Sequence, residues 1–187
     1  MQHADVDSEI DPLDLRRAFG RFGTGVTVIT TRTFDGTRLG VTANSFNTVS
    51  LEPPIVLWSL ASKSPNLEHY KSAGRFVVNV LALDQIELSS RFSRPSADKF
   101  AGVAYSDGVA GLPVLEGCTA SIECVVINNH VVGDHVLFLG RVEKYTYQDM
   151  APLLFCNGKY IEATVISPPA APASPVSASA VAARAAC

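Results

Sequence analysis

The sequence predicts a mainly β protein with a few helices, built as a closed or nearly closed barrel of antiparallel strands. Short runs of β-branched and other apolar residues recur along the chain between turns that contain Gly, Pro or Asp, a pattern typical of all-β barrels. Helical periodicity is strong only near the N-terminus, and two shorter helical segments follow in the interior.

The composition of the 187 residues is that of one globular domain, with 47% hydrophobic and 18% charged residues. The net charge of −3 without a basic cluster argues against nucleic acid as the main partner. No run approaches the roughly 18 consecutive apolar residues of a membrane span, and the start is acidic rather than signal-like. We therefore expect a cytoplasmic protein with no membrane partner. The four cysteines show no metal-ligand spacing, so we expect no metal site.

The first element expected is a helix that begins after Asp11, because Asp is a good N-cap and Pro12 suits the first helical position. Residues 1–10 ahead of it are expected to be flexible. Residues 23–25, Gly-Thr-Gly, end the helix and turn the chain. The β-branched run at 26–31 then predicts a strand.

A hairpin turn at Asp35-Gly36 leads into segment 40–54, GVTANSFNTVSLEPP, around which we take the chain to be organised. A packing strand alternates apolar and polar residues, whereas here small hydrogen-bonding residues outnumber the apolar ones. Small side chains allow the backbone to approach a flat ligand, and Asn, Ser and Thr bind a polar ring edge. The alternative is a polar edge strand that leads into a turn, and composition alone does not choose between them.

The run at 55–60 predicts a buried strand, and the loop after it combines Lys63 with the hydrogen-bonding residues Ser64 and Asn66. With the free N–H groups of the helix that follows, these side chains are suited to a phosphate. The alternative is an ordinary helix cap beside a solvated lysine.

The second half of the chain continues the β pattern. Further strands are expected at 75–81, at 120–127 and at 136–142, with a short helix at 85–92. The residues after 166 are almost only Pro, Ala, Ser and Val, so we place one domain at 11–165 and a flexible tail at 166–187.

Segment 40–57, GVTANSFNTVSLEPPIVL, resembles the signature strand of the short-chain flavin reductases, the small components that supply reduced flavin to two-component monooxygenases. The resemblance extends over about residues 11 to 163. Its other pieces are Ser90-Arg91-Phe92, Asp98-Lys99-Phe100, Gly111-Leu112-Pro113, the segment GDHVLFLGRV at 133–142 and the closing segment PLLFCNGKY at 152–160.

This resemblance implies the FMN-binding split-barrel fold and a homodimer with flavin near the subunit interface. The implied activity is that of an NAD(P)H:flavin oxidoreductase, which reduces FMN or FAD by hydride transfer and feeds a flavin-dependent monooxygenase through diffusing reduced flavin. One alternative is a split-barrel flavoprotein with tightly bound FMN that acts as an oxidase or electron carrier, and another is a non-enzymatic binding module. The sequence does not choose FMN over FAD or NADH over NADPH.

The resemblance also implies site residues. His135 corresponds to a histidine near the nicotinamide and is assigned to substrate positioning, although a lone His is more often structural. Phe92 and Phe100 either cover the cofactor or belong to the core, and Arg91 either assists the phosphate or forms a surface salt bridge. The other cofactor-binding residues expected are Thr42, Ala43, Asn44 and Ser45 at the ring edge, Ser59, Lys63, Ser64 and Asn66 toward the phosphate, and Tyr160 in the closing segment.

Overall fold

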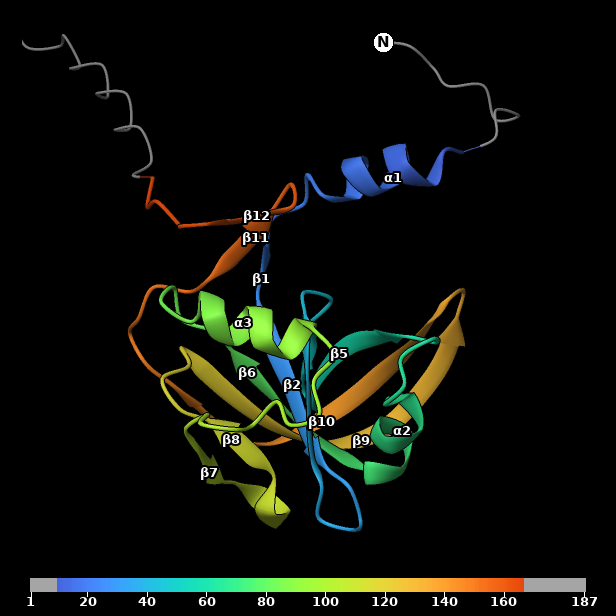
Figure 1. Cartoon of the computed structure of the whole chain (residues 1–187), viewed down its shortest axis with the longest axis vertical. Helices are drawn as coiled ribbons and strands as arrows, with labels where there is room; N and C mark the ends of the chain where they lie inside the picture. Colours follow the sequence, from blue (N-terminus) through green and yellow to red (C-terminus); the bar gives the residue numbers. More distant parts are fainter. Residues whose placement is uncertain (1–9, 167–187) are drawn as a thin grey trace, which may run out of the picture.

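The computed structural model describes residues 10–166, so the flexible segments expected at 1–10 and 166–187 lie almost wholly outside the described residues. A seven-stranded antiparallel sheet forms the body (Figure 1). This confirms the mainly β prediction. Its strands, in hydrogen-bonded order, are β3 (Arg38–Ala43), β2 (Thr27–Arg32), β6 (Arg75–Val80), β9 (Ala120–Val132), β10 (His135–Tyr147), β5 (Pro54–Ala61) and β4 (Asn47–Leu51).

Segment 40–54 does not form one strand. β3 ends at Ala43 and β4 begins at Asn47, and these two strands are the opposite edges of the sheet. Residues 44–46 leave the β-ladder and join these two edges, and so short a link is possible because the curled sheet brings β3 close to β5, the neighbour of β4. The alternative reading of a polar edge strand fits β4.

An aromatic cluster fills the interior of the barrel that the sheet forms. Trp58 stacks on Phe138 with ring centroids 4.7 Å apart, and the edges of Tyr70 and Phe76 meet the indole ring. Tyr70 comes from α2 (Leu67–Ala73), and its hydroxyl donates to the carbonyl of Ile29 at 2.8 Å. This bond fixes the helix predicted after Asn66 against β2.

A second core lies between the sheet and α3 (Ile86–Ser93), the helix that crosses above β6 and β2 in Figure 1. Phe92 is fully buried there and meets the edge of Phe100 at 5.1 Å between centroids. Both phenylalanines therefore adopt the core role that the sequence left open.

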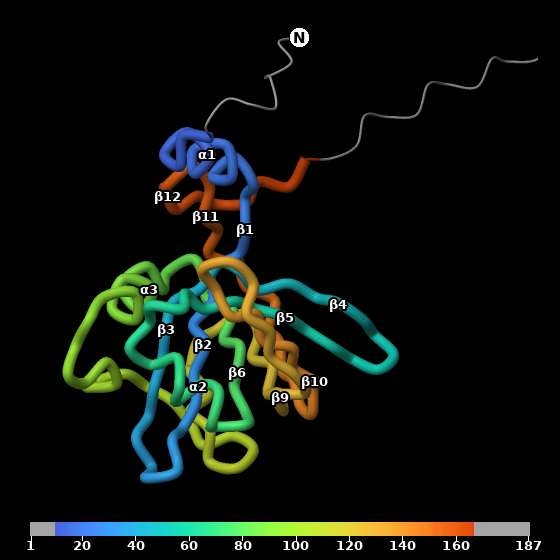
Figure 2. The backbone as a smooth tube through the Cα atoms, turned by 90° about the vertical axis from the view of Figure 1, so that its right-hand side faces the viewer, coloured from blue at the N-terminus to red at the C-terminus, as the bar shows by residue number. Residues whose placement is uncertain are grey.

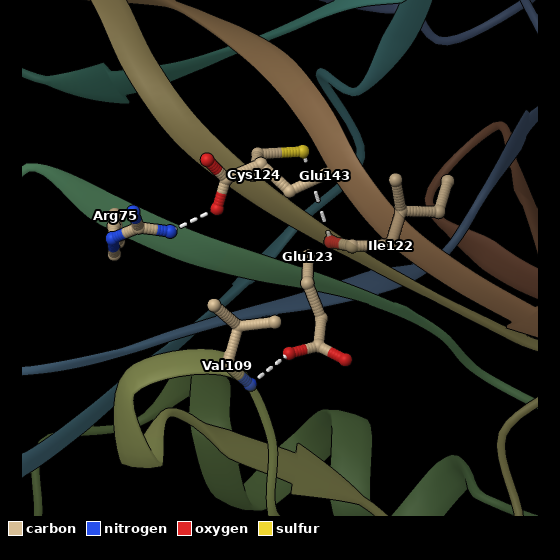
Figure 3. A network of polar contacts seen from close by, with 6 residues as sticks. All are labelled: Arg75, Val109, Ile122, Glu123, Cys124 and Glu143. Atoms are coloured by element: carbon tan, nitrogen blue, oxygen red, sulfur yellow. Dashed lines mark hydrogen bonds and ion pairs between the residues drawn. The ribbon is translucent and has the colours of Figure 1, made fainter.

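A buried carboxylate holds the loop around η1 (Val109–Gly111), which separates β7 (Tyr105–Asp107) from β8 (Pro113–Leu115). Figure 3 shows Glu123 of β9 accepting a hydrogen bond from the Val109 N–H. Lys144 Nζ lies 3.2 Å from the same carboxylate, so this buried charge is paired.

The remaining elements stand apart from the barrel. They are α1 (Pro12–Phe19), β1 (Thr24–Gly25), β11 (Leu154–Cys156) and β12 (Lys159–Ile161), which we call the arm. Figure 2 shows the arm beyond one end of the barrel, with α1 farthest out. The helix predicted at Asp11 is confirmed, since the Asp11 carboxylate accepts from the Leu13 N–H at 2.9 Å.

Among residues 10–166, no helix is long and apolar enough to span a bilayer. Within the same range, no group of three or more His, Cys, Asp or Glu residues is arranged to hold a metal ion.

Candidate ligand cavity

A cavity of about 820 Å³ lies between the arm and the barrel, and we call it the arm cavity. Its volume falls in the range of about 300–1,000 Å³ that small-molecule sites occupy. The arm contributes Arg16, Phe19, Gly20, Phe22, Thr24, Phe155 and Gly158, and the barrel contributes Asn44, Ser45, Phe46, Asn47, Leu57 and His135.

The link between β3 and β4 supplies the polar edge of this cavity. The Ser45 hydroxyl donates to the carbonyl of Ser59 and accepts from its N–H, both at 3.0 Å, so the link is fixed to β5. Asn44 and Asn47 on either side of it are exposed. The small hydrogen-bonding residues of segment 40–54 thus hold the backbone in place and present amides to the cavity.

His135 enters the cavity as the first residue of β10, where it pairs with Ala61 of β5. Its Nδ1 lies 2.7 Å from the carboxylate of Asp134. This hydrogen bond is the largest cause of the lowered pKa of Asp134. The pairing fixes the ring through Nδ1, and no described residue hydrogen-bonds to Nε2. The second ring nitrogen is therefore available to a ligand.

The residues expected at a phosphate lie elsewhere. Asn66 lines a separate cavity of about 390 Å³ with Lys99 and the β2–β3 turn. Lys99 Nζ donates to the carbonyls of Gly40 and Phe92 at 3.2 and 2.8 Å, and burial lowers its pKa. Lys63 is exposed on the loop before α2, and Ser64 accepts weakly from the Asn66 N–H at 3.4 Å.

Arg91 does not join either cavity. Its guanidinium donates to the carbonyl of Ala101 at 2.5 Å, and it lines a third cavity together with Asp84, Glu87 and Glu116. Because carboxylates surround this position, the geometry does not favour a phosphate there.

Three other expected cofactor residues make contacts within the protein. Ala43 packs against the barrel core. The Thr42 hydroxyl donates to the carbonyl of Ser89 at 2.6 Å, and the Tyr160 hydroxyl lies 2.9 Å from the Ser89 hydroxyl. The structure therefore brings Asn44, Ser45 and His135 together and places the remaining expected residues outside the arm cavity.

Sequence reasoning missed the aromatic side of the site. Phe19 and Phe22 of the arm are 70% and 75% exposed, and with Phe155 they form apolar walls of the cavity. The signal available in the sequence was the apolar face of the N-terminal helix, on which Phe19 and Phe22 recur at helical spacing. That face does not enter the core, because no residue of α1 is buried.

The family model described as flavin reductase like domain matches residues 19–164. A probable flavin reductase of Rhizobium meliloti (strain 1021) is 43% identical over 80% of this chain and 48% of its own length. The reductase component of the flavin-dependent trigonelline monooxygenase of Acinetobacter baylyi is 41% identical, over 82% of this chain and 51% of that protein. The chain thus spans about half the length of these two relatives.

Other relatives match over most of their length. An NADH-dependent flavin reductase of Rhodococcus is 38% identical, over 83% of this chain and 89% of its own. The solved structure of the flavin reductase of the styrene monooxygenase of Pseudomonas putida S12 superposes with a TM-score of 0.75 at 36% identity, covering 81% of this chain and 98% of that one.

Proposed function

From the premise that the chain belongs to the flavin reductase-like family, we propose that it is an NAD(P)H:flavin oxidoreductase. It reduces FMN or FAD by hydride transfer and supplies the reduced flavin to a separate monooxygenase. The names of the relatives support this reading, since one is an NADH-dependent flavin reductase and another the reductase component of a monooxygenase.

One observation of the structure carries the proposal: two segments of the resemblance, about 90 residues apart in the sequence, meet at one cavity. Asn44 and Ser45 come from the central segment and His135 from the segment at 133–142. Phe46 and Phe155 add apolar walls to this polar edge. A flat ring system with a polar rim, such as isoalloxazine, fits this combination.

Bound flavin and nicotinamide would supply the chemistry, which is transfer of a hydride from the nicotinamide to the flavin ring. The residues of the arm cavity would bind and orient the two rings, and its apolar walls would exclude water. We assign Asn44 and Ser45 to the ring edge. His135 positions the nicotinamide through the ring nitrogen that Asp134 does not occupy.

For the phosphate end of the flavin, the proposal rests on Ser59, Lys63, Ser64 and Asn66. Asn66 lines the cavity that also contains Lys99, whose ammonium is held by two carbonyls. The Lys99 ammonium and the Asn66 amide supply donors suited to a phosphate in this cavity, which the single carboxylate of Asp98 also lines.

We further propose that the protein is a homodimer. Leu13 and Phe22 of the arm are 66% and 75% exposed, and Leu51 of β4 is 92% exposed. Large exposed apolar groups mark interaction surfaces, and a second copy would cover those of the arm and of β4. Light scattering on the purified protein tests this, and a monomeric mass at micromolar concentration would contradict it. We also propose that the protein is located in the cytoplasm and that residues 11–165 form its one domain.

The deciding experiment measures oxidation of NADH and of NADPH by the purified protein, with and without added FMN or FAD. Turnover that depends on added flavin is the expected result, and the preferred pair identifies both cofactors. A protein that retains flavin through desalting and oxidises neither nucleotide would contradict the proposal in favour of a tightly bound FMN.

A further inference from the structure

The arm sheet carries a row of three side chains on one face. Thr24 of β1 pairs with Phe155 of β11, and Phe155 pairs with Tyr160 of β12. Directly paired residues of antiparallel strands project from the same face of a sheet. The first two of these side chains line the arm cavity, so this face is the roof over the proposed ring site.

The third side chain of the row makes a contact with the barrel instead. The Tyr160 hydroxyl lies 2.9 Å from the hydroxyl of Ser89 on α3, and Ser89 is only 1% exposed. The rings of Phe155 and Tyr160 meet edge to face at 5.6 Å between centroids. A displacement of Tyr160 would therefore move Phe155, which forms a wall of the cavity.

Backbone hydrogen bonds fix only the base of the arm. Val26 donates to the carbonyl of Leu153 at 3.0 Å, and Leu153 donates to the carbonyl of Leu81 at 2.9 Å. Beyond this point, among the described residues, the Tyr160–Ser89 contact is the side-chain hydrogen bond that joins β12 to the barrel. Phe155 of β11 also packs against the second core, so loss of the Tyr160–Ser89 bond would loosen the outer part of the arm sheet at β12.

Ser89 also connects this contact to the central segment. Its carbonyl accepts from the Thr42 hydroxyl at 2.6 Å, and Thr42 lies two residues before Asn44. One buried serine thus joins the roof of the cavity, helix α3 and the strand that leads to the polar edge.

We propose that Tyr160 is a positioning residue, which holds the roof of the arm cavity at a fixed height over the ligand through its hydrogen bond to Ser89. It acts through Phe155 and does not itself touch the reacting atoms. The assignment rests on the proposed function for the identity of the ligand, whereas the restraint on the arm stands independently of it.

The test uses Tyr160→Phe, Ser89→Ala and the double variant, with Tyr147→Phe as the matched control, since Tyr147 is 78% exposed on β10. Loss of one hydrogen bond predicts a KM for the nicotinamide nucleotide raised about 2- to 10-fold with kcat little changed. The KM of the double variant should be no higher than the higher KM of the two single variants, because both substitutions remove the same hydrogen bond. Tyr147→Phe should match the wild type.

Amide hydrogen exchange provides a readout that does not depend on catalysis. Exchange at residues 154–161 should become faster in Tyr160→Phe, while exchange in β6 and β9 and the melting temperature remain near those of the wild type. Additive effects on KM, or exchange that is unchanged in the arm or faster throughout the chain, would overturn the assignment. If the wild type oxidises neither nucleotide, the proposed function fails, and the exchange experiment still decides whether Tyr160 restrains the arm.

Discussion

The hydroxyl of Thr24 is buried in the roof of the arm cavity and has no hydrogen-bond partner among the described residues. A buried hydroxyl left unpaired costs about 1–3 kcal/mol. Such a cost is understandable where a ligand accepts the hydrogen bond. Thr24→Val keeps the shape of the side chain and removes the hydroxyl. Its effect on the stability of the free protein can therefore be distinguished from its effect on ligand binding.

Two opposite effects are expected from Thr24→Val. The melting temperature should rise by at least about 2 °C, because 1 kcal/mol corresponds to about 2–4 °C in a domain of this size. The KM for flavin or nicotinamide nucleotide should rise about 2- to 10-fold, because the ligand loses a donor. Differential scanning calorimetry and steady-state kinetics measure the two effects.

The matched control is Thr31→Val. The Thr31 hydroxyl is also buried, but it donates to the carbonyl of Arg75 at 2.7 Å, far from the arm. This substitution should lower the melting temperature and leave KM unchanged. A lower melting temperature in Thr24→Val as well would refute the reasoning, since it would mean that the hydroxyl is satisfied in the free protein.

Three further outcomes follow from the structure. His135→Ala should raise the KM for the nicotinamide nucleotide about 2- to 10-fold while flavin binding, measured by titration, stays unchanged; an unchanged KM would contradict the role of His135. Gly40→Ala should destabilise the protein by about 1–3 kcal/mol in urea unfolding, since its Cβ would lie 2.3 Å from the Phe92 ring; wild-type stability would contradict this packing. Asp35 has its pKa lowered from 3.8 to about 2, chiefly by the Thr33 hydroxyl. Because the folded pKa is the lower one, its stabilising effect is full above pH 3.8 and is lost as the pH falls through 2. The melting temperature of Asp35→Ala should therefore lie below that of the wild type at pH 7 and approach it on acidification; a constant difference would contradict the assignment.

Local signals in the sequence predicted the fold well. The N-cap at Asp11, the turn at Asp35-Gly36 and the helix around Ile86 all depend on neighbouring residues, and the structure confirms them. The role of segment 40–54 was predicted only in part, because its division between two edge strands depends on where the sheet closes. Periodicity along the chain contains no such information.

Most of the site depends on tertiary placement. Glu87 lies one helical turn before Arg91 in the sequence, but nothing in the sequence shows that Glu116 lines the same cavity, where carboxylates favour a guanidinium and disfavour a phosphate. Likewise the apolar face of α1 reads as core, and only the structure shows that it stands outside the barrel. The resemblance identified the segments that contribute to the candidate site, and the structure shows which of their side chains line the same cavity.

The charge of the arm cavity agrees with the proposed chemistry. Its described lining residues include a guanidinium, Arg16, and an imidazole, His135, but no carboxylate. Nicotinamide nucleotides and flavin phosphates are anions, so a lining without acidic groups avoids the repulsion that the protein's overall charge of −3 would otherwise add. Hydride transfer between two bound rings also needs no protein carboxylate as acid or base. Hydride transfer does need the two rings to be held in a fixed orientation. In the proposed roles, the hydrogen bond of Tyr160 to Ser89 restrains the roof and that of Ser45 to Ser59 fixes the polar edge.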